Sequence, residues 1–432
     1  MTTTRAVGVR RWTGRALLGL LVVWLVATTV NQLITGDFWL AGIPNPLPPL
    51  LFFAGPMALL TTVAMLGLAR TSLPRLDRVL LSLSIAVVLL VVLHLLLSGR
   101  TWVWVLPDLM PPILFLLMPV ALLAALAVVV IRRVSLRRPV ALSVAVLSVI
   151  ALVLGVGQAG LNMSALVGGS TDGPAPPGSV HVVTWDTLEW TTAGKDPDRF
   201  YRFLTDRHAD VYLLQNYPHS GPESFQLAAD SERLRREFPG YQFATVGGLL
   251  TISRFPIVAQ KPMETNPVPP PGTDNIWYLS SWKYGVLRTD LDVHGRIFSV
   301  YNVFFYDRFF LHVMPLTPAF FRNIRGLDEG RAQQVDQLLA EVATNPHPLL
   351  VSGNLNVLPN TGDRNRLDVF KDAGRADRSL YPASLTFVGL SLWRMDWTFT
   401  SPTVGVHGYD LVPPDGLSSR HLQDVVVSLP RP

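Results

Sequence analysis

The first residue with a candidate chemical role is Asn354, which ends an apolar run. Residues 348–360, PLLVSGNLNVLPN, read as a strand from Pro348 to Val351 that enters a tight Ser-Gly-Asn turn. Strand ends of this kind are usual places for catalytic side chains. An amide oxygen can ligate a hard cation, but it supplies no charge and cannot act as a base near neutral pH. An enzyme that used this strand end for catalysis would therefore need unusual chemistry. Otherwise, the fold is that of an enzyme that has lost its activity.

The elements around this turn alternate between strand-like and helical patterns. Residues 196–209 place Phe200, Phe203 and Leu204 on one helical face, and residues 329–343 repeat apolar positions at helical spacing. Together with neighbouring strand pairs, this alternation predicts mixed sheets covered by helices. The strand-like runs are residues 180–186, 210–215, 249–258, 284–293, 296–305, 348–352, 394–402 and 422–429.

Seven short motifs lie in or directly beside these runs, in a fixed order. They are VVTWD (182–186), DVYLLQN (210–216), ISRFPI (252–257), VYNVFF (300–305), VSGNLN (351–356), RMDWTF (394–399) and SSRH (418–421). Through them, residues 180–429 resemble the endonuclease/exonuclease/phosphatase superfamily, the DNase I-like fold. The resemblance implies a C-terminal four-layer α/β sandwich with its site at one rim. It also implies hydrolysis of phosphate esters with Mg²⁺ or another divalent cation.

Four positions that carry charge or titrate in this superfamily are substituted. The metal-binding Glu corresponds to Asn216, the water-orienting Asp to Asn354, a His to Phe304, and the Asp of Ser-Asp-His to Arg420. An amide offers a metal no charge, and phenylalanine offers a phosphate no hydrogen bond. Arginine puts a fixed cation where the family has an anion. These changes predict absent or severely impaired metal-dependent hydrolysis.

Four family positions are retained, namely Asn302, Asn356, Asp396 and His421. The resemblance implies that His421 and Asp396 hydrogen-bond each other and that the imidazole contacts the phosphate. These residues are either remaining catalytic groups or a buried hydrogen-bonding network without catalysis.

One substitution adds a carboxylate instead of removing one. Asp186 stands where the family has an Asn, and it is a candidate metal ligand. Glu189 is a second candidate ligand, although it also reads as an exposed loop residue. Arg420 beside His421 could bind an anion, such as a phosphate or a lipid headgroup, without a metal.

The first 160 residues differ in composition from the rest. Their uncharged apolar runs are each long enough for a helix of about 20 residues, the length that spans a hydrocarbon core. His94 reads as an interfacial or helix-contact residue, and TWVWVLPD (101–108) as an aromatic interfacial belt. The sequence predicts an N-terminal all-α bundle of five transmembrane helices, at about residues 16–35, 48–68, 79–98, 111–131 and 139–159.

Charge sets the expected orientation. Residues 1–160 hold 12 Arg, no Lys and 3 Asp, whereas the rest holds 24 basic and 28 acidic residues. Eleven of the 12 arginines flank the spans on one side, and only Arg100 lies on the other. This predicts a multi-pass plasma membrane protein with a cytoplasmic N-terminus and an extracytoplasmic C-terminal domain. The acidic balance of that domain makes nucleic acid an unexpected partner.

The remaining segments complete the expected organisation. Residues 161–179 read as a Gly/Pro/Ser linker, and residues 180–432 as the domain. Two aromatic-rich insertions, 266–282 and 306–321, are predicted either to touch the bilayer or membrane half or to form a local core. The absence of cysteine excludes disulfides and thiolate chemistry.

Three functions are consistent with these observations. The leading hypothesis is a non-catalytic or severely impaired phosphoesterase homologue that binds a phosphate-bearing or lipid ligand of the envelope, or a membrane protein partner. The first alternative is an active phosphoesterase with a site relocated to Asp186, Asp396 and His421. The second is a scaffold for a membrane assembly. The arrangement resembles membrane-anchored bacterial relatives, which implies a bacterial cell envelope.

Overall fold

The computed structural model describes ten segments of the chain. The predicted span 16–35, Glu189, all of insertion 266–282 and residues 309–316 lie outside them. The described segments are residues 39–40, 43–44, 47–188, 196–217, 220–221, 224–225, 228–265, 283–308, 317–387 and 389–430.

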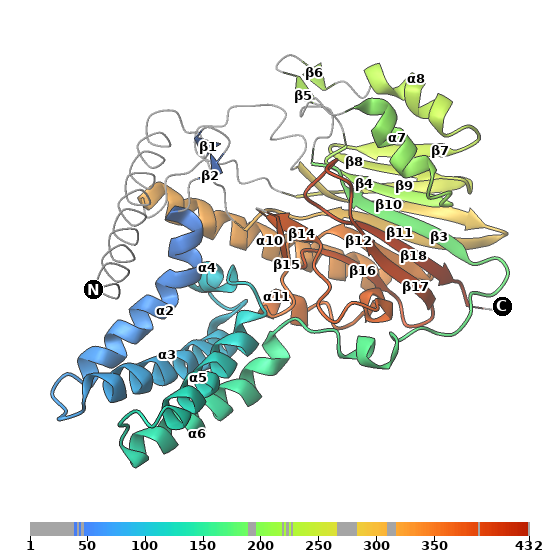
Figure 1. The fold of residues 1–432 in the computed structure, drawn as a ribbon. Helices are drawn as coiled ribbons and strands as arrows, with labels where there is room; N and C mark the ends of the chain where they lie inside the picture. Colours follow the sequence, from blue (N-terminus) through green and yellow to red (C-terminus); the bar gives the residue numbers. More distant parts are fainter. Residues whose placement is uncertain are drawn as a thin grey trace, which may run out of the picture.

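Three helices in the described part of the chain are long and apolar enough to cross a membrane. They are α3 (Arg75–Leu97), α5 (Leu114–Ile131) and α6 (Arg138–Gly155), the last continuing into η2 (Val156–Gln158). Each coincides with a predicted span, and together they project from the rest of the chain as a bundle (Figure 1).

Among the described residues there are three candidate spans, whereas five were predicted for the chain, one of them (16–35) outside the described residues. Helix α2 (Leu47–Gly67) covers the predicted span 48–68, but only its part Ala54–Gly67 registers as a shorter apolar helix. The bundle exposes apolar side chains outward, for example Leu142 and Val153, each 67% exposed. An apolar outer face of this kind suits a lipid environment.

Two six-stranded sheets form the C-terminal domain. The first has the strand order β13-β16-β12-β11-β10-β9, and the second has the order β17-β18-β3-β4-β8-β7. The first sheet comprises β9 (Ile257–Glu264), β10 (Tyr284–Val293), β11 (Arg296–Phe304), β12 (Leu349–Asn354), β13 (Lys371–Asp372) and β16 (Asp396–Thr400). The second comprises β3 (Val180–Asp186), β4 (Val211–Gln215), β7 (Gln242–Val246), β8 (Leu249–Ser253), β17 (Gly405–Val412) and β18 (Leu422–Ser428).

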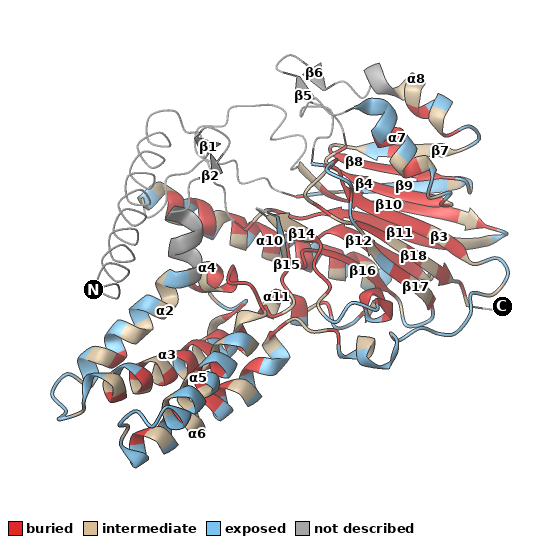
Figure 2. Ribbon diagram, viewed as in Figure 1, coloured by how far each residue is buried: buried red, intermediate tan, exposed pale blue. Residues whose placement is uncertain are grey.

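The two-residue period of the strands builds two separate cores. In β3, Val180 and Val182 face the other sheet, whereas Val183 and Trp185 face the covering helices. Successive side chains of a strand point to opposite faces, so a continuous apolar run fills both layers. Nearly all of this interior is buried (Figure 2).

Helices cover the outer face of each sheet and complete the predicted four-layer sandwich. Helices α7 (Pro197–Thr205) and α8 (Ala228–Glu237) pack on the second sheet, and α10 (Pro318–Thr344) packs on the first. Helix α10 begins well before the predicted residue 329. Thr317 caps it by accepting a hydrogen bond from the Phe320 backbone N–H, and Pro318 occupies its first turn.

Short elements connect these layers. They are β1 (Trp39–Leu40), β2 (Ile43–Pro44), η1 (Trp102–Trp104), α4 (Val105–Asp108), η3 (Met163–Val167), β5 (Ser220–Gly221), β6 (Ser224–Phe225), α11 (Gly362–Asn365), η4 (Ala373–Ala376), β14 (Leu385–Phe387) and β15 (Leu390–Trp393).

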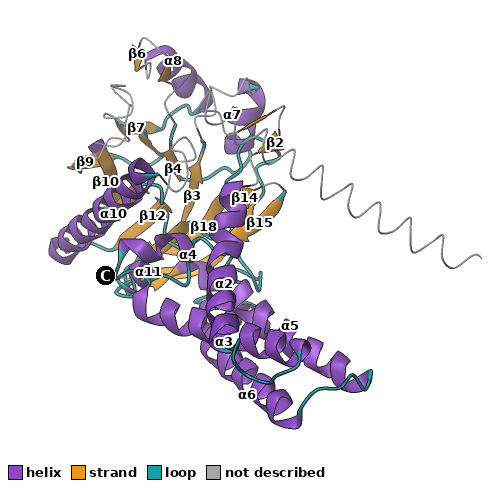
Figure 3. Ribbon diagram, turned by 90° about the vertical axis from the view of Figure 1, so that its left-hand side faces the viewer, coloured by secondary structure: helices purple, strands orange, loops and turns teal. Residues whose placement is uncertain are grey.

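The helical bundle and the sandwich meet in a packed junction (Figure 3). Its apolar part joins Val105 and Leu109 to Phe320 and Ile324 of α10. The end of insertion 306–321 therefore contacts the helical half, as one reading of that insertion predicted. This contact favours a fixed relation between the two halves.

A buried polar cluster forms the rest of the junction. The His94 Nδ1 atom lies 3.2 Å from an Asp108 carboxylate oxygen, and its Nε2 atom lies 2.6 Å from the Asn360 carbonyl oxygen. The Arg308 guanidinium lies between Asp108 at 3.8 Å and Asp363 at 3.3 Å. His94 is thus a contact residue, as predicted, but its partners include the sandwich as well as neighbouring helical residues.

The predicted linker lies against the sandwich. Asn162 donates a side-chain hydrogen bond to the Asp377 carbonyl at 2.7 Å, and Asp172 exchanges backbone and side-chain hydrogen bonds with Val406. These bonds attach residues 161–179 to the domain surface.

Candidate functional site

Parallel strand pairing gathers the predicted site residues at one rim. Asp186 pairs with Gln215 across β3 and β4, and Phe304 pairs with Asn354 across β11 and β12. Asn354 also pairs with Asp396 at the start of β16. Carboxyl ends of parallel strands meet at one edge of a sheet, so side chains distant in sequence become neighbours.

Backbone geometry at the ends of β4 and β12 requires particular residues. Gly353 has a φ of +146°, and a Cβ there would lie 2.0 Å from the Val303 carbonyl oxygen. Asn216 and Asn356 have φ values of 48° and 51°, in the left-handed region that asparagine tolerates well. Part of the Asn-rich character of this rim is therefore conformational.

Asp186 is the centre of the rim and is 1% exposed. One carboxylate oxygen accepts hydrogen bonds from the Asn216 side-chain amide at 2.9 Å and the Leu188 backbone N–H at 3.0 Å. The other accepts from the Asn354 side-chain amide at 2.7 Å. The two asparagines that were predicted to replace acidic family positions thus serve as hydrogen-bond donors to Asp186.

Arg420 supplies a buried cation next to this carboxylate. Its Nε atom lies 4.0 Å from Asp186 Oδ2, and its Nη1 atom lies 3.4 Å from Asp396 Oδ2. Although burial acts to lower it, the carboxylates of Asp396, Asp186 and Asp307 raise the pKa of the guanidinium. Arg420 therefore stays charged and offsets the negative charge of the rim.

Two carboxyl groups at the rim, those of Asp396 and Asp307, have raised pKa values. Burial raises the pKa of Asp396 to about 6, against the opposing effect of Arg420. Burial likewise raises the pKa of Asp307 to about 6, and the charge of Asp186 adds to the rise. The Asp307 side chain is partly exposed, whereas Asp396 is 2% exposed. Burial is therefore the better-supported cause of the raised pKa at Asp396.

The expected pair of His421 and Asp396 is wrong. Asp396 Oδ2 accepts from the Ser384 hydroxyl at 2.6 Å and contacts Arg420, whereas Oδ1 has no hydrogen-bond partner among the described residues. The His421 ring contacts the Thr386 hydroxyl at 3.2 Å, and burial lowers the pKa of its imidazole. Among the described residues, Arg420 and Ser384 are thus the side-chain partners of Asp396, both at Oδ2.

Two other predicted residues have structural contacts. Asn302 accepts from the Gln215 side-chain amide at 2.6 Å and donates to the carbonyls of Leu214 and Leu250, so it ties the two sheets together. Phe304 packs in a hydrophobic cluster with Leu287 and its neighbours. Because of these contacts, neither side chain is free to bind a ligand.

Asn356 connects the rim to a residue that the sequence analysis missed. Its side-chain amide donates to the Phe305 carbonyl at 2.8 Å and to the Asp307 carboxylate at 3.0 Å. Asp307 follows the end of β11 within a segment that reads as an insertion, and no family motif marks it. Its position, three residues after Phe304, is the one feature of the sequence that could have indicated Asp307 as a rim residue.

The rim does not fit a hard divalent cation. The N–H groups of Asn216 and Asn354 point at Asp186, and the guanidinium of Arg420 lies where its charge would repel a metal. Among the residues that the structure describes, no group of three or more His, Cys, Asp or Glu side chains is arranged to hold a metal ion. The described rim residues therefore form a buried network in which Arg420 offsets the charges of Asp186 and Asp396.

Comparison with solved structures finds several proteins that are similar to part of this chain. A crystal structure of an endonuclease/exonuclease/phosphatase from Bacteroides vulgatus is 16% identical and covers 58% of this chain and 99% of its own, with a TM-score of 0.40. One from Beutenbergia cavernae is 17% identical and covers 58% and 72%, with a TM-score of 0.41. A mannosyl-6-phosphatase from Bacteroides thetaiotaomicron is 14% identical and covers 58% and 100%, with a TM-score of 0.41. The curated proteins give no match.

The sequence also matches a family model directly. The model is described as the Endonuclease/Exonuclease/phosphatase family, and it matches residues 188–421, more than half of the 432-residue chain. This stretch contains six of the seven motifs in full and the rim residues other than Asp186. The chain therefore belongs to the endonuclease/exonuclease/phosphatase family.

Proposed function

We propose that this chain is a membrane-anchored family member that has exchanged metal-dependent hydrolysis for ligand or partner binding outside the cytoplasm. One observation carries the first part: the Asp186 carboxylate is held by two amide donors, with the Arg420 cation beside it. The ligand would be a phosphate-bearing or lipid component of a bacterial envelope, or a membrane protein partner. Nucleic acid is not expected, because the domain is acidic overall.

The test of the first part is turnover by the full chain in detergent. Diester and monoester nitrophenyl phosphates would be assayed with Mg²⁺ and Mn²⁺, alongside Asp186→Ala. We expect no metal-dependent turnover above the level of that variant, because the rim offers no metal site. Robust turnover that Asp186→Ala abolishes would refute the proposal.

A relocated active site is the alternative that this assay also tests. Asp186 and Asp396 are buried and joined to Arg420, and His421 contacts Thr386, so these residues form no open cleft in the described structure. The partly exposed carboxyl is that of Asp307. Metal-independent turnover lost in Asp307→Asn would favour an enzyme over a binding module.

The second part, the membrane placement, has its own test. The chain contains no cysteine, so single cysteines can be labelled without background. An impermeant maleimide applied to intact cells should label Arg235→Cys on α8 but label Arg133→Cys only after lysis. Arg133 lies in the loop between α5 and α6, on the side that the arginine distribution assigns to the cytoplasm. The reverse pattern would overturn the proposed orientation.

A further inference from the structure

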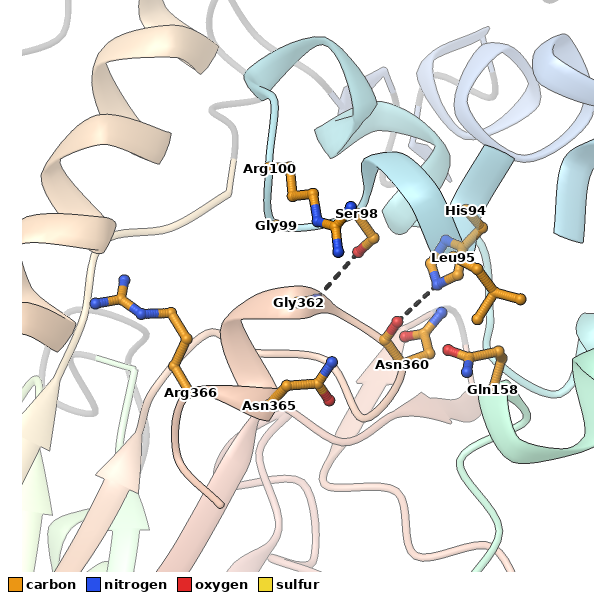
Figure 4. Close-up of a pocket in the computed structure, with 10 residues that line it drawn as sticks. All are labelled: His94, Leu95, Ser98, Gly99, Arg100, Gln158, Asn360, Gly362, Asn365 and Arg366. Carbon is orange, nitrogen blue, oxygen red and sulfur yellow. Dashed lines mark hydrogen bonds between the residues drawn. The ribbon is translucent and has the colours of Figure 1, made fainter. Parts of the chain in front are cut away.

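A pocket lies at the junction between the helical bundle and the sandwich, away from the rim. It has a volume of ≈ 280 Å³ and lies between the end of α3 and the chain around α11. In Figure 4 the amides of Asn360 and Gln158 lie on one side of the pocket, and the guanidinium groups of Arg100 and Arg366 lie on the other. A volume of this size is roughly nine times the ~30 Å³ that one water molecule occupies in the liquid.

Asn360 is the residue that most directly indicates a ligand. It is 5% exposed, and neither its side-chain oxygen nor its side-chain nitrogen has a hydrogen-bond partner in the described structure. Its carbonyl oxygen is held by His94, so the residue is fixed in place while its amide stays unsatisfied. A buried amide with two unpaired atoms is costly unless something in the pocket bonds to it.

The charges around the pocket favour an anion. The exposed guanidinium of Arg100 forms no hydrogen bond or ion pair with any described residue, whereas Arg366 is paired with Asp336. Arg100 is also the one arginine of the helical half that does not flank the predicted cytoplasmic side. An arginine beside amide donors is a typical recognition set for phosphate oxygens.

The apolar surroundings favour an amphiphile over a soluble anion. Leu95 lines the pocket, and Leu95 and Leu96 are 41% and 52% exposed on α3, one of the three candidate spans. The pocket therefore opens next to a surface suited to acyl chains, at the end of α3 opposite Arg75 and Arg78. A headgroup in the pocket would leave its chains along this surface.

We infer that this pocket binds the phosphate headgroup of an anionic membrane lipid, through Arg100 and the amide of Asn360. The inference rests on the membrane placement in the proposed function, but not on the loss of hydrolysis at the rim. It assigns a lipid-binding role to the junction that joins the two halves of the chain.

The test is native mass spectrometry of the full chain in detergent, titrated with phosphatidylglycerol, phosphatidylcholine or inorganic phosphate. We expect phosphatidylglycerol to bind about tenfold more tightly than phosphatidylcholine, whose choline cation opposes Arg100. Arg100→Gln and Asn360→Leu should each weaken phosphatidylglycerol binding by about tenfold. Asn360→Leu keeps the number and branching of the side-chain heavy atoms and removes an unsatisfied amide, so a thermal melt should show a folded chain.

Arg375→Gln is the matched control, because Arg375 is an exposed arginine of the sandwich outside the pocket. It should bind phosphatidylglycerol as the wild type does. Equal binding of the two lipids, or wild-type affinity in both pocket variants, would leave a water-filled pocket and overturn the inference. Displacement of the lipid by inorganic phosphate of equal affinity would also overturn it, in favour of a soluble ligand. Cysteine labelling reports the membrane placement separately, so a failure here is distinguishable from a failure there.

Discussion

Arg420→Met is expected to be one of the two most destabilising changes in this domain. It removes the buried cation that lies 3.4 Å from Asp396 and 4.0 Å from Asp186, and it leaves their charges uncompensated. Breaking a buried ion pair from one side typically costs about 3–5 kcal/mol. For a domain of this size, that loss corresponds to a fall of about 10 °C in melting temperature, measurable by tryptophan fluorescence of the full chain.

The loss of stability caused by Arg420→Met should depend on pH in a defined direction. Burial raises the pKa of Asp396 to about 6, above the value of about 3.9 for an unfolded chain. At pH values between these two pKa values, the folded state holds this proton and the unfolded state does not. The carboxyl therefore adds stability as the pH falls from 7 to 5 and removes it as the pH rises. Protonated Asp396 needs no cation, and the loss caused by Arg420→Met should be smaller at pH 5 than at pH 7.5.

Arg254→Met is the matched control for this prediction. Arg254 also pairs with an aspartate, Asp210, but its side chain is 56% exposed. Exposed pairs contribute about 0–1 kcal/mol, so the control should melt within a few degrees of the wild type. A loss at Arg420 no larger than this, or one that is independent of pH, would contradict the role assigned to the guanidinium.

The strand architecture was predictable because it depends on local patterns. Residues 284–293 were predicted as a strand and form β10 with the same bounds, and the apolar run at Val180–Asp186 forms the two-faced strand β3. Family motifs fixed the order of the strand ends, which is enough to bring Asp186, Asn354 and Asp396 to one rim.

Side-chain partners at the rim were less predictable, because several groups compete for each one. The prediction joined His421 to Asp396, but the charged guanidinium of the preceding residue, Arg420, contacts that carboxylate instead. Asp307 was missed because nothing in its local sequence distinguishes it from a loop residue. The contact of Arg308 with Asp108 joins residues 200 positions apart, and no periodicity encodes it.

The double variant Asn216→Glu/Asn354→Asp is the second change with a large expected effect. It replaces both amide donors of Asp186 by carboxylates, one at a position now 2.7 Å from an Asp186 oxygen. Without Mg²⁺, three close carboxylates repel one another more than Arg420 alone can offset, and we expect a loss of at least about 3 kcal/mol at pH 7.5 in EDTA. The same change supplies the anionic oxygens that Mg²⁺ requires.

Mg²⁺ should therefore stabilise the double variant but not the wild-type protein. Any ligand that binds only the folded state stabilises it, by about 2.7 kcal/mol at a hundredfold excess over its dissociation constant. The melting temperature of the double variant should rise with Mg²⁺, whereas that of the wild type should not change. Asn354→Leu is the control that removes the amide without adding charge, and it should be destabilised without responding to Mg²⁺. A wild type that responds as the variant does would show that Asn216 and Asn354 are not what keeps the metal out.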